Sequence, residues 1–421
     1  MKKLISILLF LLMPPCMSTA LPSQAVSKRN FQFINGQWFD GKKFTARTFY
    51  SVGGVLTSKR PSRIDSVIDL KMSYVIPPFG EAHNHNMDGG EPEKRIRMYL
   101  EDGIFYVKNP NNLPRNRTAL AGKINTPTSV DVVFSNGGLT STGGHPAGHV
   151  RRNISRKIFT EADAEGAFYY SADNEADLDR QWDVITAGKP DFVKTYLLYS
   201  EEYAKRRNNE EFFGRRGLDP ALLPKIVGKA HAAGLRVSTH VESATDFHHA
   251  LVAGVDEINH MPGFRGDHRN EFPDPKVYEI AEADARLAAR KGTFVVTTLS
   301  GFRQLDEKNP VRLTAEVLFA RNLRLLSKHR VRVAIGSDSY RETSAPEAMF
   351  LASLKVFDHL TLLKMWCETT AEAIFPGRKI GRLKDGYEAN FLVLAGDPLK
   401  DFANTGKIEM RVKRGELLSL P

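Results

Sequence analysis

The segment Gly80-Glu81-Ala82-His83-Asn84-His85 closes an apolar stretch at residues 77–85, and the fold prediction starts from it. Side chains at positions i and i+2 of a β-strand point to the same side, so His83 and His85 are expected to face one interior. Two imidazoles on one face, at the carboxyl end of a strand, suit a shared metal ion. An HxH pattern alone is a weak signal, so the rest of the chain has to support it.

Seven further apolar bursts follow this segment, each typical of a buried strand and most of them separated by helical stretches. The bursts lie at residues 103–107, 130–134, 192–196, 236–240, 257–260, 293–297 and 331–335. The clearest helical stretches lie at residues 221–233, 281–290, 315–328 and 346–355. Eight strands that alternate with helices predict a distorted (β/α)8 TIM barrel over residues 78–372.

The sequence at both ends of the chain has patterns typical of β-strands, without helical stretches between them. Residues 28–77 contain short apolar runs with the turn signals Asn35-Gly36 and Asp40-Gly41, and residues 373–421 return to a β pattern. We therefore expect a small β-sandwich module built from both ends of the chain. The polar stretch 107–127 is predicted as a long loop after the second strand and is a candidate lid over the site.

Composition indicates an ordinary globular protein. Hydrophobic residues make up 42% and charged residues 26% of the chain, and the mean hydropathy of −0.32 excludes a membrane protein with many spans. The formal net charge is +10, but the basic residues are scattered, with no run of five and no interleaved aromatic residues. We therefore expect a small-molecule substrate rather than a nucleic acid partner, and the sequence leaves a homo-oligomer open.

The first residues have the pattern of a secretory signal. Lys2 and Lys3 precede a mainly apolar stretch of ten residues at positions 4–13, and small residues follow at positions 18–20. A stretch of ten residues is too short to span a bilayer, so no integral membrane association is expected. We predict that residues 1–25 are a signal peptide and that the protein is periplasmic or secreted.

Residues able to bind metal stand at four other predicted strand ends. Lys194 lies in an apolar stretch where a charged ammonium group is costly, so it either reaches toward solvent or is carbamylated and bridges two metals. His240, His260 and Asp338 each come at the end of a predicted strand. A single core histidine usually has a structural explanation, but placement at four separate strand ends is hard to attribute to chance.

This set of strand-end residues resembles the metal-dependent amidohydrolase superfamily. The flanking residues 75–83, 231–237 and 381–394 are similar to that superfamily as well, although Glu81 and Asn390 stand where it usually has Asp. Lys194 together with the Gly143-Gly144-His145 motif resembles the binuclear imidazolonepropionase-like and prolidase-like members. Taken together, these motifs extend the resemblance over about residues 30–415.

The resemblance implies a metal centre with named ligands. His83 and His85 would bind the more buried ion with Asp338, His240 and His260 would bind the more exposed ion, and carbamylated Lys194 would bridge them. The mixed nitrogen and oxygen ligands suit Zn, with Mn, Fe or Co as alternatives. A mononuclear site with an unmodified Lys194 remains the alternative to two ions.

The resemblance also implies a reaction. It implies hydrolysis of a C–N bond in an amide, cyclic amide or dipeptide-like substrate by metal-activated hydroxide, with Asp338 as general base. A lactone or ester hydrolase on the same scaffold and a non-catalytic metal-retaining protein are the alternatives. The sequence contains no GxSxG, Walker, GxGxxG or HExxH pattern that would favour other chemistry.

Three further residues are candidates for contact with the substrate. His145 follows the third strand and could hydrogen-bond a substrate carbonyl or stabilise an oxyanion, which makes it a candidate catalytic and substrate-binding residue. Tyr196 and Tyr199 follow Lys194 and could donate to the substrate, although packing in the core explains each equally well. His149 is predicted to lie in a loop, because Pro146 and Gly148 disfavour a helix.

Overall fold

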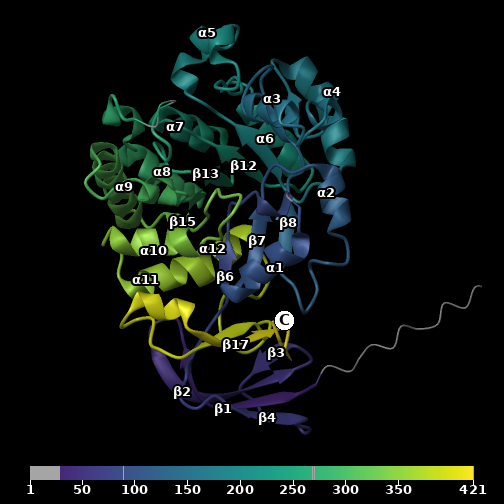
Figure 1. The fold of residues 1–421 in the computed structure, drawn as a ribbon, viewed down its shortest axis with the longest axis vertical. Helices are drawn as coiled ribbons and strands as arrows, with labels where there is room; N and C mark the ends of the chain where they lie inside the picture. The colour runs from purple at the N-terminus through teal and green to yellow at the C-terminus, as the bar shows by residue number, and fades with distance from the viewer. Residues whose placement is uncertain (1–28, 89, 268, 270, 421) are drawn as a thin grey trace, which may run out of the picture.

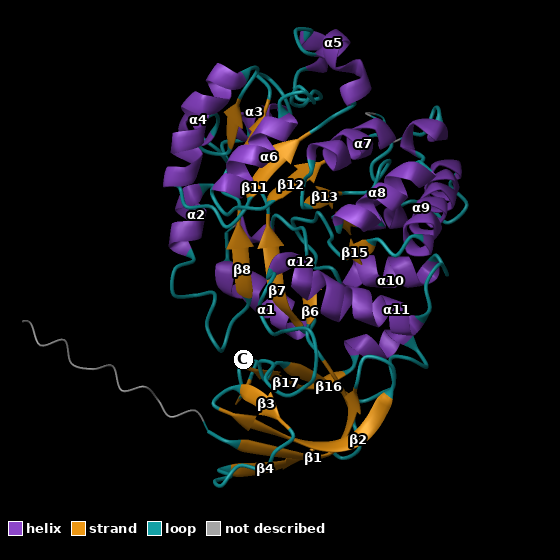
Figure 2. Ribbon diagram, turned by 180° about the vertical axis from the view of Figure 1, so that it is seen from behind, coloured by secondary structure: helices purple, strands orange, loops and turns teal. Residues whose placement is uncertain are grey.

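The computed structural model describes residues 29–88, 90–267, 269 and 271–420, and Figures 1 and 2 show their arrangement. The predicted signal peptide at residues 1–25 lies outside the described residues. No helix in the described ranges combines the length and the apolar character needed to cross a membrane.

Two parallel sheets form the centre of the larger part of the molecule. The first is a three-stranded sheet of β6 (Phe79–Glu81), β7 (Ile104–Asn109) and β8 (Asp131–Phe134). The second has seven strands in the order β10 (Tyr169–Ser171), β9 (Gly138–Thr140), β11 (Val193–Tyr196), β12 (Val237–His240), β13 (Glu257–Asn259), β14 (Phe294–Val296) and β15 (Arg332–Ala334).

Hydrogen bonds join these two sheets at both sides. Beyond the ends of β6 and β15, Ala82 N donates to Ile335 O over 2.9 Å, and Asp338 N donates to His83 O over 2.7 Å. On the other side, Asp191 N donates to Phe134 O over 2.8 Å. The parallel strands therefore form a TIM-barrel-like α/β fold, as the alternating pattern predicted.

The third predicted strand, residues 130–134, corresponds to β8, and the next strand, β9, lies in the other sheet. β8 pairs with β7, and β9 pairs with β11. Between them the backbone of Asn136 is left-handed, with φ of 59°, and its N–H donates to the side chain of Asn112. β9 and β10, which pair with each other, are additional strands that the sequence pattern did not predict.

Helices cover the outside of the parallel strands (Figure 2). They are α1 (Pro92–Glu101), α2 (Pro114–Ala119), α3 (Ala147–Ser155), α4 (Glu175–Ala187), α5 (Tyr203–Arg206), α6 (Leu223–Ala232), α7 (Ala244–Ala253), α8 (Glu282–Lys291), α9 (Pro310–Lys328), α10 (Ala345–Ser353), α11 (His359–Lys364) and α12 (Thr370–Ile374). In α9 the buried residues Ala315, Leu318, Phe319, Leu323 and Leu326 follow helical spacing, so one face packs inward.

Two local predictions were wrong. The stretch 107–127 is not one long loop, because it contains the end of β7 and the helix α2. His149 lies in α3 rather than in a loop. Pro146 precedes the first turn of this helix, where its missing N–H removes no helical hydrogen bond.

The two ends of the chain form an extra sheet below the parallel strands (Figure 1). Its strands are β1 (Phe31–Phe39), β2 (Phe44–Val52), β3 (Val55–Thr57), β4 (Ser66–Asp69), β5 (Tyr74–Ile76), β16 (Phe391–Leu394), β17 (Ile408–Lys413) and β18 (Glu416–Leu417). Where the sequence predicted a sandwich, the structure has one continuous sheet of eight strands.

This sheet curls around an aromatic core. Leu56 N, in the end strand β3, donates to Tyr387 O over 2.8 Å, just before β16. Inside the curl the Trp38 ring lies 4.7 Å from Phe49 and 5.2 Å from Phe391, measured between ring centroids. Rings from both ends of the chain therefore share one apolar core, which holds the two chain ends together.

A buried ionic cluster fixes the extra sheet to the parallel strands. Asp131, at the start of β8, pairs with Lys413 of β17 at 2.7 Å, with Arg414 at 3.0 Å and with Arg378 at 2.9 Å. Asp131 and Lys413 are fully buried, and burial lowers the pKa of Lys413 to about 8 although Asp131 opposes the shift. Three cations of the carboxyl-terminal segment thus converge on one carboxylate.

Replacement of Asp131 by Asn is expected to destabilise the fold. The change leaves the Lys413 ammonium group buried without a counter-charge, which costs about 3–5 kcal/mol of unfolding free energy. Urea denaturation followed by circular dichroism measures this loss. The control is Asp179→Asn, which removes an exposed pair with Lys229 and is expected to leave the midpoint unchanged. Equal midpoints for Asp131→Asn and wild type would contradict the prediction.

Candidate metal centre and active site

The six predicted metal ligands converge on one cavity. His83 and His85 follow β6, Lys194 lies in β11, and His240 ends β12; His260 follows β13, and Asp338 follows β15. All six line a cavity of about 90 Å³ at the carboxyl ends of these parallel strands. Parallel strands bring their carboxyl ends to the same side of a barrel, which is why residues far apart in sequence meet here.

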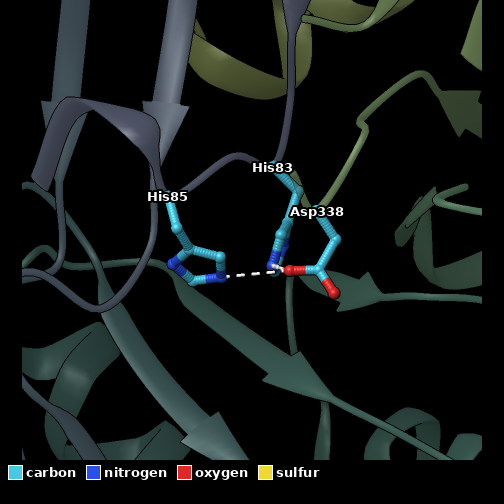
Figure 3. A group of neighbouring side chains, drawn as sticks. All are labelled: His83, His85 and Asp338. Atoms are coloured by element: carbon cyan, nitrogen blue, oxygen red, sulfur yellow. Dashed lines mark ion pairs between the residues drawn. The ribbon is translucent and has the colours of Figure 1, made fainter. Parts of the chain in front are cut away.

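His83, His85 and Asp338 form the tightest group in this cavity (Figure 3). The Oδ1 atom of Asp338 lies 3.1 Å from His85 Nε2 and 3.5 Å from His83 Nε2. Potential ligand atoms of the three side chains lie within 4.8 Å of one another. Two nitrogens and one carboxylate oxygen at this separation suit a divalent ion.

His240 and His260 lie beside this group. The His260 ring centroid is 4.6 Å from that of His83 and 4.6 Å from that of His240. Nδ1 of His260 is 2.8 Å from the Thr298 hydroxyl, and the ring stacks on Phe264 at 3.9 Å. These contacts fix the orientation of the imidazole, as outer contacts of a metal ligand do.

Lys194 lies on the floor of the cavity and is completely enclosed. Its Nζ donates a hydrogen bond to Oδ1 of Asn259, whose Nδ2 donates to Glu257 over 2.8 Å. Glu257 in turn pairs with the buried Lys108 at 2.8 Å. Burial lowers the pKa of Lys194 to about 7, although Asp338 opposes the shift. An amine with this pKa is partly unprotonated near neutral pH.

Two of the predicted ligands have a left-handed backbone. The φ angles are 73° at His260 and 50° at Asp338, a conformation that side chains with a Cβ rarely adopt. Each such residue costs on the order of 1–3 kcal/mol, so surrounding contacts must hold it in place. Gly336, just before Asp338, also allows a close approach, because a Cβ there would lie 2.8 Å from His83 N.

Glu81 is one of the groups that hold this backbone. Its carboxylate accepts hydrogen bonds from Ser337 N and the Ser337 hydroxyl, both at 2.8 Å, and from His83 N at 3.3 Å. Burial raises the pKa of Glu81 to about 8, although these donors oppose the shift. The carboxylate therefore connects the segment after β6 with the segment after β15.

Glu347 of α10 has the same role beside His260. Its buried carboxylate accepts hydrogen bonds from the backbone N–H groups of Thr298, Leu299 and Ser300 at 2.7–2.9 Å. The backbone of Thr298 has φ of 123°, and its hydroxyl contacts His260. The Glu347 carboxylate thus fixes the segment after β14 that orients a predicted ligand.

The protonation states fit a metal-binding site. Burial lowers the pKa of His83 to about 3, and it holds the pKa values of His240 and His260 well below the usual range. Burial opposes ionisation of Asp338, but Arg265 and the neighbouring histidines outweigh it, so its pKa lies well below the usual range. Neutral imidazoles and an ionised carboxylate are the forms that bind metal.

The Nε2 atoms of His83 and His85 face Oδ1 of Asp338 and are the nitrogens that could bind an ion beside it. Two imidazole nitrogens and a carboxylate oxygen are a donor set that divalent ions bind. The residues therefore fit a divalent metal.

The predicted substrate-contacting residues separate into two places. His145 and Tyr196 line the metal cavity, with ring centroids 5.1 Å apart, and the His145 ring stacks over His240 at 5.1 Å. Tyr199 does not line that cavity. It borders a neighbouring cavity of about 900 Å³, where its hydroxyl contacts Gly266 O at 3.2 Å and the Tyr278 hydroxyl at 3.3 Å.

Several cavity residues were missed by the sequence analysis. Arg265 contacts Oδ2 of Asp338 at 2.6 Å, and Tyr340 stacks on His85 at 5.2 Å. The other missed residues of the cavity wall are Asn111, Pro146, His149, Arg152 and Phe168. Tyr340 stands two positions after Asp338, so proximity was a usable signal, but nothing in the sequence distinguished Arg265 from other loop arginines.

The sequence profile of the amidohydrolase family matches residues 208–418, which include His240, His260 and Asp338. The chain belongs to the amidohydrolase family. It is a hydrolase that acts on carbon–nitrogen bonds of small molecules. Members of the amidohydrolase family generally bind divalent metals, and the His83–His85–Asp338 group fits that property.

Solved structures similar to this amidohydrolase show the same fold. An ochratoxinase from A. niger has a TM-score of 0.69 at 17% identity, covering 93% of this chain and 96% of its own. A prolidase complexed with N-methylphosphonate-L-proline has a TM-score of 0.70 at 18% identity, and the match covers 93% of this chain and 99% of the prolidase. Molinate hydrolase has a TM-score of 0.72 at 14% identity, and the match covers 94% of this chain and 95% of the molinate hydrolase. No curated protein sequence matches this chain.

Replacement of Glu347 by Ala is expected to destabilise the amidohydrolase. Three buried backbone N–H groups lose their acceptor, which costs roughly 2–4 kcal/mol of unfolding free energy. Chemical denaturation measures this loss. The matched control is Glu316→Ala on α9, which removes only a partly exposed pair with Arg312. If both variants unfold at the wild-type midpoint, the carboxylate does not hold the segment after β14.

Proposed function

We propose that the protein is an exported metal-dependent amidohydrolase that cleaves the C–N bond of an amide, a cyclic amide or a dipeptide-like substrate. The observation that carries this proposal is the convergence of four histidines, Lys194 and Asp338 on one small cavity. Export is proposed from the signal pattern of residues 1–25. The barrel would span residues 78–372, with the chain ends at 28–77 and 373–421 forming the second module.

The metal centre is proposed to be binuclear. His83, His85 and Asp338 would hold one ion, and His240 and His260 would hold a second. The carboxylate of a carbamylated Lys194 would bridge them. Zn is the first choice for this set of nitrogen and oxygen ligands, with Mn, Fe or Co as alternatives.

Carbamylation fits the surroundings of Lys194. Its amine is buried among histidines, where a positive charge would repel a dication. The unprotonated amine can attack carbon dioxide, forming an N–C bond and releasing one proton, and the product carries one negative charge. The low pKa of Lys194 makes this form of the amine accessible near neutral pH.

Asp338 is proposed as the general base. A divalent ion held beside it would lower the pKa of water from about 15.7 to about 7 and so supply hydroxide near neutral pH. Asp338 is ionised, and its Oδ1 faces the histidine pair while Arg265 holds Oδ2. The ionised Asp338 would take the proton from the water and return it to the leaving amine.

His145 is proposed to bind the substrate carbonyl. Burial holds its pKa well below the usual range, so the imidazole is neutral, and it lies beside Tyr196 and His240 at the cavity wall. A neutral imidazole N–H can donate to the carbonyl oxygen as negative charge develops there. Tyr196 is a second candidate donor, and Tyr199, in the neighbouring cavity, would contact a more distant part of the substrate.

The substrate class is tested with purified, metal-loaded protein. We expect turnover of at least one class among N-acyl amino acids, dipeptides and hydantoins, because an amide carbonyl in this cavity would lie beside Asp338 and His145. Asp338→Asn, which keeps the shape of the side chain, serves as the inactive control. Turnover of lactones alone would make the protein an ester hydrolase, and tightly bound metal without any turnover would favour a binding protein.

The bridge is tested by the metal content of Lys194→Ala. Wild type grown with added bicarbonate is expected to hold two metal ions per chain, and the variant at most one, because the bridging carboxylate is lost. Inductively coupled plasma mass spectrometry on both proteins gives the ratio. One ion in both proteins, with equal activity, would leave a mononuclear site with Asp338 as base.

A further inference from the structure

Two cavities meet at the active site. The metal cavity of about 90 Å³ adjoins the larger cavity of about 900 Å³, and His145, Arg152 and Arg265 border both. The smaller cavity is the one that contains the predicted ligands, so we expect the reacting group to bind there. The rest of a larger substrate is then expected to extend past these three residues into the larger cavity.

Arg152 differs from the other cations that line these cavities. Its side chain is exposed and makes no hydrogen bond or ion pair with any residue that the structure describes. Each of the others has a partner: Lys194 donates to Asn259, Arg265 to Asp338, Arg206 and Lys205 to Glu202, and Arg215 to the carbonyl of Glu211. Arg152 is therefore the one described lysine or arginine of the two cavities whose side chain has neither a hydrogen-bond nor an ion-pair partner among the described residues.

The helix that carries Arg152 points it at the junction. His149 and Arg152 stand three positions apart on α3 and both line the metal cavity, so this face of the helix is turned toward the site. Gly148 packs against Gly214, where a Cβ on Gly148 would lie 3.2 Å from the Gly214 Cα. This close contact fixes α3 against the segment that borders the larger cavity.

We propose that Arg152 binds the carboxylate of the substrate and that preferred substrates are N-acyl amino acids or peptides with a free carboxylate on the leaving amine. This inference rests on the proposed function. The planar guanidinium group can donate two parallel hydrogen bonds to the two oxygens of a carboxylate. An amino-acid leaving group carries its carboxylate one carbon from the scissile nitrogen, which suits the short path from the metal cavity to the junction.

The test compares two substrates that differ only in the carboxylate, such as alanyl-proline and alanyl-pyrrolidide. Wild type is expected to have the higher kcat/KM for the carboxylate form. Arg152→Met is expected to lower kcat/KM for that form by roughly 10- to 150-fold, the range for a charged hydrogen bond. On the pyrrolidide, kcat/KM of the same variant is expected to stay within about twofold of wild type. On the carboxylate form, kcat/KM of Arg152→Lys is expected to lie between those of wild type and Arg152→Met.

The control variant is Arg151→Met on the same helix, whose guanidinium lies 4.0 Å from the centre of the Phe213 ring. It is expected to leave both kcat/KM values unchanged. An equal loss on both substrates in Arg152→Met, no loss on either, or a wild type that does not distinguish the two would each overturn the carboxylate assignment while the hydrolase stands. No turnover of any C–N substrate by metal-loaded wild type would contradict the proposed function itself, and the assignment would fall with it.

Discussion

The carboxylate of Glu81 joins the first and last strands of the parallel core, and the geometry of the site depends on that junction. It accepts hydrogen bonds from His83 N and from both the backbone and the hydroxyl of Ser337. His83 and His85 lie on one side of this junction and Asp338 on the other, 3.1–3.5 Å apart, and the backbone bond from Asp338 N to His83 O supports the same junction. Removal of the carboxylate would leave buried donors unpaired beside the left-handed backbone of Asp338.

The strand-end residues could be predicted because a single rule places them. Parallel strands in a TIM-barrel-like fold direct their carboxyl ends to one side, so His240, His260 and Asp338 meet once their strands are recognised. Arg152 and Arg265 follow no such rule, since one lies on a short helix and the other in a loop without periodicity. The helix around His149 was missed because Pro146 and Gly148 were taken as breakers, whereas Pro is tolerated at a helix start.

The departures in the fold have causes that propensity does not express. The chain leaves the first sheet after β8 at Asn136, whose backbone N–H donates to the Asn112 side chain and whose C=O accepts from Asn112 N. The chain ends form one curled sheet because Trp38 and Phe391, which are far apart in sequence, pack in the same core. Both features depend on contacts between distant residues, which short-range patterns in a single sequence cannot specify.

Rigid and adjustable parts of the site are carried by different elements. Glu81 and Glu347 each accept backbone N–H groups from a segment that follows a strand, and those segments position Asp338 and His260. Such buried carboxylates offset the strain of left-handed residues, so the predicted ligands are held before any metal or substrate binds. Arg152, by contrast, is exposed and has no side-chain hydrogen bond or ion pair within the described part of the chain, so its replacement is expected to cost the fold little. Substrate preference can therefore change on α3 while the metal-binding geometry stays the same.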